Sequence, residues 1–142
     1  MRRVQLLIVV LLLSIAAFAA TGVRQAAVQP FPKTLINAQY VYVTSYDGDQ
    51  FDPRLLPEDR AAIANVQDAV QKWGRYTLVY RAQDADMILI VQSRPSEDVL
   101  AVYDAHIPGS SYMWRAMGRE GLQKNETPLV SQLQRAVDQA GK

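Results

Sequence analysis

The sequence predicts one α+β domain, a two-layer sandwich in which two helices pack on one face of a mixed sheet of about five strands. Strand-like segments and amphipathic helices follow one another in the order β-α-β-β-β-β-α. Each helix carries a single apolar stripe, so both need a sheet to cover. Without an expected signal peptide, roughly 120 residues remain, a length that suits one ordinary domain.

The start of the chain has the features of a secretory signal peptide. Arg2 and Arg3 precede residues 4–20, which are almost entirely apolar. The Ala-Phe-Ala sequence that ends at Ala19 fits the small-x-small cleavage pattern. We expect a signal peptide over residues 1–19 and a periplasmic or secreted protein. The alternative is an uncleaved segment 4–20 that anchors the domain in the inner membrane.

Composition excludes several classes of function. The chain has no cysteine, which excludes a lipid-anchored cysteine, disulfides, thiolate metal sites and thiol catalysis. Its 15 Lys and Arg nearly balance its 14 Asp and Glu, and the two signs are mixed along the chain. No basic stripe suggests binding to nucleic acid or anionic lipid. We expect no nucleic-acid partner, and contact with a membrane only through an uncleaved signal segment.

The first strand follows a segment without clear periodicity. Residues 20–37 contain two prolines, which predicts a linker or a loosely packed arm. The single domain is expected to span residues 38–142. Residues 38–46 alternate, with Val41 and Val43 on one face, and their valine, tyrosine and threonine content is typical of a half-buried strand.

A helix and two further strands follow. Residues 56–74 predict an amphipathic helix because apolar side chains recur at spacings of three and four. Pro57 suits its first turn and Gly74 its end. Residues 75–80 and 87–92 are extended runs joined by a turn, and the second is apolar on both faces, as a central strand is.

A hairpin and a helix complete the domain. Residues 98–105 and 111–118 predict two strands joined by a loop with a proline and a glycine. Thr127 and Pro128 mark the start of an amphipathic helix that closes the chain.

An acidic segment is the most site-like stretch of the sequence. Residues 44–60 hold five acids, of which Asp47, Asp49 and Asp52 come first. Counted as an EF-hand loop from Asp47, the segment places Phe51 at a ligand position, so the pattern fails. We interpret the acids as turn residues and as partners of the helix dipole. The alternative is a cation-dependent module that uses the loop from Asp47 to Asp52.

His106, the only histidine, lies in the predicted hairpin loop with Asp104 and Ser110. One imidazole without cysteine cannot build a multi-ligand zinc site. The three side chains suggest a small hydrolase as an alternative function. A triad needs its members on rigid elements, however, and no G-x-S-x-G elbow presents a serine. We therefore expect no catalytic residues, no metal and no cofactor.

Aromatic strand residues are the best candidates for binding. If several tyrosines share the uncovered face of the sheet, they form a surface for a partner or ligand. The alternative is that they are half-buried strand residues with wet hydroxyls, and that Trp114 packs inward. Tryptophan and arginine are frequent at binding hot spots. The predicted interaction surface comprises Tyr40, Tyr42, Tyr76, Tyr80, Tyr112, Trp114, Arg115 and Arg119.

The order of these features resembles that of uncharacterised secreted bacterial α/β domains. The similarity covers about residues 38–140 and is carried by the segments VYVTSY, DADMILIV and YMWRAMG. The chain also resembles the periplasmic domains of the curli-secretion lipoprotein type and the amino-terminal domain of the TolB protein. This resemblance implies a non-enzymatic binding or interaction module of the cell envelope, whose partner is an envelope protein or a small ligand. The lipobox cysteine of the lipoprotein members is missing here.

Overall fold

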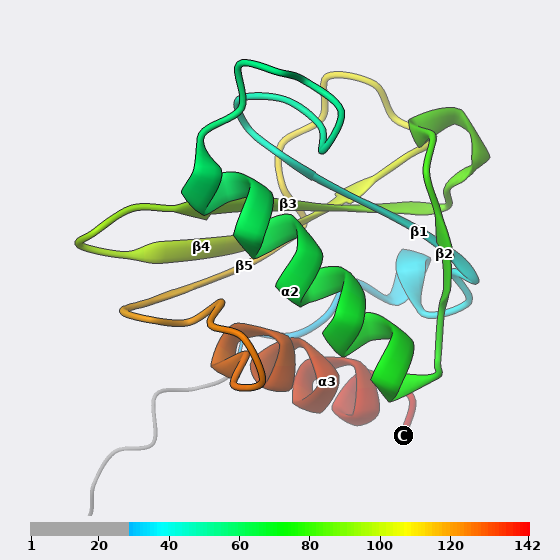
Figure 1. The fold of residues 1–142 in the computed structure, drawn as a ribbon. Coiled ribbons are helices and arrows are strands. Elements are labelled where there is room, and N and C mark those ends of the chain that lie inside the picture. The colour runs from blue at the N-terminus through cyan, green and yellow to red at the C-terminus, as the bar shows by residue number, and fades with distance from the viewer. Residues whose placement is uncertain (1–28) are drawn as a thin grey trace, which may run out of the picture.

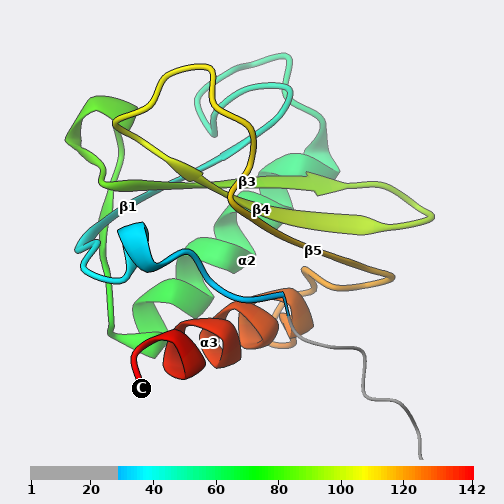
Figure 2. The ribbon, with the colours of Figure 1, turned by 180° about the vertical axis from the view of Figure 1, so that it is seen from behind.

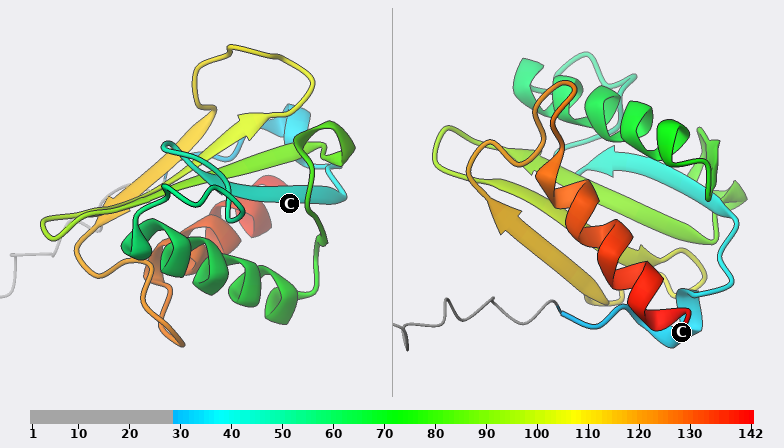
Figure 3. Two further views of the ribbon diagram at one scale, coloured as in Figure 1. Left: turned by 45° about the horizontal axis from the view of Figure 1, so that its top comes forward. Right: turned by 90° about the horizontal axis from the view of Figure 1, so that it is seen from below.

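The computed structural model describes residues 29–142 and shows a two-layer α+β fold (Figure 1). One layer is a five-stranded sheet, and the other consists of helices α2 (Pro57–Trp73) and α3 (Pro128–Ala140). Both helices lie on the same face, as the edge-on view in Figure 3 shows. The predicted fold class and element order are confirmed. The expected signal peptide lies outside the described residues.

The sheet has the strand order β2-β1-β3-β4-β5. Its strands are β1 (Tyr40–Ser45), β2 (Thr77–Val79), β3 (Met87–Ser93), β4 (Asp98–Asp104) and β5 (Trp114–Gly118). Strand β1 runs parallel to both of its neighbours, β2 and β3, whereas β4 is antiparallel to β3 and to β5. Strand β3 is therefore central, as its apolar composition on both faces predicts.

The core lies between the sheet and the helices. Alternate strand residues such as Val43 and Leu89 point to the helices and are buried. The facing stripe of α2 contributes Ile63, Val66 and Val70, which have no exposed surface. Within residues 29–142, the other face of the sheet carries no α-helix, and Figure 2 shows it toward the viewer. We call this uncovered side the open face.

The connection from β2 to β3 partly covers the open face. Because β2 and β3 flank β1 and both run parallel to it, residues 80–86 must carry the chain back across β1. This connection contains a single turn of 3-10 helix, η3 (Ala82–Asp84), where the sequence predicts a turn. Ala82 and Gln83 line a hollow together with the open-face residues Ile88 and Ile90, so η3 lies on the open face.

The arm before β1 is packed where the structure describes it. Phe31 is 3% exposed and Leu35, in the 3-10 turn η2 (Lys33–Leu35), is 4% exposed. The indole Nε1 of Trp114 donates a hydrogen bond to the carbonyl oxygen of Gln29 at 3.0 Å. The prediction of a loosely packed arm up to residue 37 is therefore wrong for residues 29–37. Such a short segment is too irregular to show a period, although Phe31 and Leu35 are buried in the core.

None of the helices within residues 29–142 is long and apolar enough to cross a membrane.

Candidate binding groove on the open face

The open face carries rows of side chains that follow the strand register. Tyr42 of β1, Ile88 of β3 and Tyr103 of β4 lie next to one another in one row. The neighbouring row contains Thr44, Ile90, Ala101 and Arg115, and a third contains Gln92, Val99 and Met117. The face is thus largely apolar and aromatic, although no α-helix of the described residues covers it.

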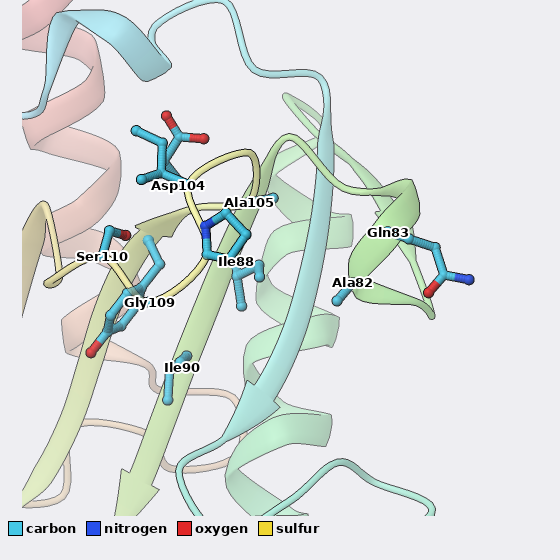
Figure 4. Close-up of a pocket in the computed structure, with 11 residues that line it drawn as sticks. Ala82, Gln83, Ile88, Ile90, Asp104, Ala105, Gly109 and Ser110 are labelled. Carbon is cyan, nitrogen blue, oxygen red and sulfur yellow. The ribbon is translucent and has the colours of Figure 1, made fainter.

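A groove of about 550 Å³ lies on this face (Figure 4). Ile88 and Ile90 form its floor, η3 forms one wall, and the loop from Ala105 to Ser110, between β4 and β5, forms the other. This volume lies within the range of small-ligand pockets. We call it the open-face groove. Its lining residues are Ala82, Gln83, Ile88, Ile90, Tyr103, Asp104, Ala105, Ile107, Pro108, Gly109 and Ser110.

Tyr103 gives the groove an aromatic side. Its hydroxyl lies 3.2 Å from the hydroxyl of Tyr46, which follows β1. Burial, and to a lesser extent this hydrogen bond, raises the pKa of Tyr103 to about 12. The phenol is therefore neutral over the physiological pH range, and Tyr103 offers a ligand an apolar ring and an uncharged hydroxyl.

The interior of the groove contains few polar groups. Asp104 lines the groove, but its carboxylate points away from Ile88 and Ile90 (Figure 4). It faces a second, more polar hollow of about 360 Å³, which is also lined by Asp86, His106 and Tyr40. The groove therefore suits an apolar group better than a charged one.

His106 lies between two carboxylates at the second hollow. Its Nδ1 is 3.4 Å from Asp104 Oδ1, and its Nε2 is 3.9 Å from Asp86 Oδ1. The other carboxylate oxygen of Asp86 accepts hydrogen bonds from the backbone N–H groups of Gln39 and Tyr40 at 2.9 and 3.0 Å. These two bonds lower the pKa of Asp86, and the charge of His106 lowers it further.

The structure separates the members of the predicted hydrolase triad. Asp104 and His106 are close, but Ser110 lines the open-face groove whereas His106 lines the second hollow. Within residues 29–142, no hydrogen bond joins Ser110 to His106. A serine nucleophile needs its base within hydrogen-bonding reach, so these three side chains do not form a triad in this structure.

Two carboxylates of the acidic segment, those of Asp49 and Asp52, accept hydrogen bonds from the backbone of the same segment. Asp49 Oδ1 accepts hydrogen bonds from the backbone N–H groups of Phe51 and Asp52 at 2.8 and 3.1 Å, which forms a turn. Asp52 accepts from the backbone N–H of Arg54 and pairs with its guanidinium, and both contacts lower the pKa of Asp52. No cluster of three metal-ligating side chains occurs in the described part of the chain.

Two further acids of this segment, Asp47 and Asp59, take part in an ion-pair network that the sequence does not reveal. Asp59 is completely buried in the first turn of α2, and Asp47 lies just after β1. Arg94, from the turn between β3 and β4, lies 3.0 Å from Asp59 and 2.6 Å from Asp47. The network is structural, because it joins three segments of the fold.

The predicted interaction surface is divided by the structure. Tyr42 is half-buried on the open face. Tyr112 is exposed, and the Arg115 guanidinium lies 5.6 Å from the centre of the Tyr112 ring. Tyr40 and Tyr80 are exposed at the ends of β1 and β2.

Other members of the predicted surface lie elsewhere. Arg119 is exposed beyond the end of β5. Trp114 is 1% exposed on the helix-covered face and Tyr76 is 7% exposed, so both are corrections to the predicted surface. The physical reasons are the core position of the indole and the edge-to-face packing of Tyr76 on Trp73, with ring centres 5.1 Å apart.

Several groove residues are absent from the predicted surface. Ile88 and Ile90 carry a signal in the sequence, because their strand is apolar on both faces while the domain has helices for only one. Tyr103 lies in a predicted strand, but alternation alone does not reveal which face it shares. Tyr46 lies beyond the end of β1, where alternation no longer applies.

In comparisons with protein-family models, with curated proteins and with solved structures, no match to this chain was found. The resemblance to envelope domains therefore stays a prediction, and the function of the groove has to be argued from its own geometry.

Proposed function

We propose that this protein is an exported, non-enzymatic binding module of the bacterial cell envelope, and that it binds a partner protein through the open-face groove. One observation carries the proposal: apolar side chains stay accessible on a sheet face that residues 29–142 leave without a covering α-helix. Ile107 is 53% exposed at the wall of the groove, next to the half-buried floor residues Ile88 and Ile90. Apolar patches of this kind mark interaction sites in monomeric proteins.

The surroundings of the groove favour a protein partner. Tyr46 and Tyr112 are both 45% exposed, and Arg115 lies against Tyr112. Tyrosine and arginine around an apolar depression are typical of binding hot spots, where one side chain of the partner fills the pocket. We infer that an aliphatic or aromatic side chain of the partner occupies the groove and that the partner's backbone or polar groups contact the tyrosine hydroxyls.

The sequence supports the proposed location. The basic start, the apolar segment 4–20 and the cleavage pattern before residue 20 are features of exported proteins. Export would bring the groove into the same compartment as envelope proteins. The expected resemblance to periplasmic partner-binding domains agrees with this location.

Photocrosslinking in intact cells of the native host tests the proposal. A photoreactive amino acid in place of Ile107 should capture one envelope protein reproducibly. The matched control is the same amino acid in place of Leu56, an apolar residue of similar exposure at the start of α2, away from the groove. Equal capture of the same protein from both positions, or no capture from residue 107 in a folded and exported protein, would contradict the proposal.

A small apolar ligand is the other occupant that this experiment must distinguish. If residue 107 captures no protein, native mass spectrometry of the purified protein should be examined for a bound small molecule. A bound molecule that is lost in Ile107→Asp but kept in Leu56→Asp would replace the protein partner by a small ligand. The open-face groove would then still be the binding site.

A further inference from the structure

His106 belongs to the loop that forms one wall of the open-face groove, and it lines the second hollow. The loop that forms one wall contains His106 itself, and Asp86 directly follows η3 and Ala85 on the other side. The imidazole reaches both sides, with Nδ1 3.4 Å from Asp104 and Nε2 3.9 Å from Asp86. A single titratable ring therefore lies between the loop and the end of the β2–β3 connection.

Both carboxylates are held in place by backbone groups, so the ring is the adjustable part. Asp86 is fixed by the N–H groups of Gln39 and Tyr40, and Asp104 Oδ1 accepts a hydrogen bond from the His106 N–H at 2.8 Å. The Ala105 N–H donates to the Asp86 carbonyl oxygen at 3.1 Å, which ties the start of the loop to the same residue.

The charged groups that face the imidazole are carboxylates. The hollow that His106 faces is formed by η2, the start of β1, the residue before β3 and the end of β4. The ionisable groups among its lining residues are Tyr40, Asp86 and Asp104, and no lysine or arginine lines it. A neutral imidazole can donate from only one nitrogen, whereas the cation donates from both and can bond to both carboxylates.

We propose that protonation of His106 acts as a clasp that fastens the loop wall of the open-face groove to Asp86. In mildly acidic conditions the cation bridges Asp86 and Asp104, and the loop from Ala105 to Ser110 becomes more ordered. In mildly alkaline conditions the bridge is lost and the loop opens more often. Histidine is the side chain that ordinarily changes charge in this range. The consequence for binding rests on the proposed function, but the clasp itself does not.

Amide hydrogen exchange of the full chain without any partner tests the clasp. The informative amides are those of Ala105, Ile107 and Ser110, which donate to the carbonyl oxygens of Asp86, Asp104 and Ile107, respectively. Their protection factors, which already correct for intrinsic exchange, should rise roughly two- to fivefold from pH 7.5 to pH 5.5, the gain expected for a largely exposed ion pair. Carboxylates ordinarily stay ionised over this range, so the imidazole is the group that changes.

Two variants make the result decisive. His106→Gln keeps a hydrogen-bonding side chain that cannot be protonated, and it should abolish the rise. Asp86→Asn keeps an acceptor for the Gln39 and Tyr40 N–H groups but removes the charge, and it should reduce the rise. An unchanged rise in His106→Gln, or no rise in the wild-type protein, would overturn the clasp. Because no partner is present, that result would leave the proposed function untouched, and failed crosslinking would leave the clasp untouched.

Discussion

Arg94 holds the buried carboxylate of Asp59 with its Nη1, which lies 3.0 Å from both carboxylate oxygens. The Ser93 N–H donates to the same carboxylate at 2.8 Å. Asp59 is completely buried, so its charge needs these donors. Through Nη2, Arg94 also reaches Asp47 at 2.6 Å. Asp47 and Asp59 of the acidic segment are thus explained by a structural ion-pair network.

Removal of the Arg94 charge should destabilise the fold strongly. Arg94→Met leaves the Asp59 carboxylate buried beside a single N–H donor, a change that typically costs about 3 kcal/mol of the free energy of unfolding. The control is Lys72→Met, which removes an exposed pair with Asp68 and should cost less than about 1 kcal/mol. Urea denaturation at pH 7 measures both. Equal small losses would show that the Arg94–Asp59 pair is not needed for stability.

The pair of glycines near Leu129 should respond differently to the same substitution. A Cβ at Gly121 would lie 2.5 Å from Leu129 Cγ, whereas a Cβ at Gly118 would meet the nearest Leu129 carbon at 3.5 Å, an ordinary contact. Gly121→Ala should therefore destabilise the protein by about 1–3 kcal/mol through overpacking, and Gly118→Ala by less. Thermal or urea unfolding of the two variants checks this ranking. A Gly121→Ala variant that is more stable than the wild-type protein would contradict the packing of α3 against the segment after β5.

The indole hydrogen bond of Trp114 should hold the arm on the domain. Trp114→Phe keeps an aromatic ring in the core but leaves the Gln29 carbonyl oxygen without its donor. We expect a loss of about 1–3 kcal/mol and faster proteolysis near residue 29, because the loss of a hydrogen bond and the formation of a small cavity both cost free energy. Limited proteolysis with mass spectrometry measures the second effect. Unchanged cleavage near residue 29 would show that the bond does not fix the arm.

The pH dependence of stability should contain a contribution from Asp86. Backbone hydrogen bonds lower its pKa in the folded protein below the unfolded value of about 3.9. A group whose pKa is lowered by folding stabilises the protein above the unfolded pKa, and this stabilisation is lost as the pH falls through the folded pKa.

Wild-type protein should consequently have a higher Tm than Asp86→Asn at pH 6, and the difference should shrink as the pH falls below about 4. Calorimetry from pH 6 to pH 2 measures the two curves. A Tm difference that stays constant over this range would show that the Asp86 charge does not contribute to folding.

Local patterns were sufficient to predict the elements but not their relationships. The stripe of α2 and the alternation of β1 depend on residues close together in the sequence, so both are visible there. The groove depends on the path of residues 80–86 across β1, which follows from the strand order. Strand order is set by contacts between distant segments, and no local period records it.

The errors in the predicted surface have the same origin. Alternation places Trp114 and Arg115 on opposite faces, but it does not say which face the helices cover. Phe31 and Leu35 lie in a segment too short to show a period, although both are buried. Asp59 and its partner Arg94 are far apart in the sequence, so their pairing is visible only in the fold.

Recovery of partner proteins from the native host tests whether the open-face groove binds a partner protein. Tagged Ile107→Asp and Leu56→Asp variants should be isolated from crosslinked cells, and the proteins recovered with them compared by quantitative mass spectrometry. Our account predicts that Ile107→Asp loses the wild-type partner while Leu56→Asp keeps it, with both variants folded and exported. Equal recovery of the partner with the two variants would contradict the assignment of the groove.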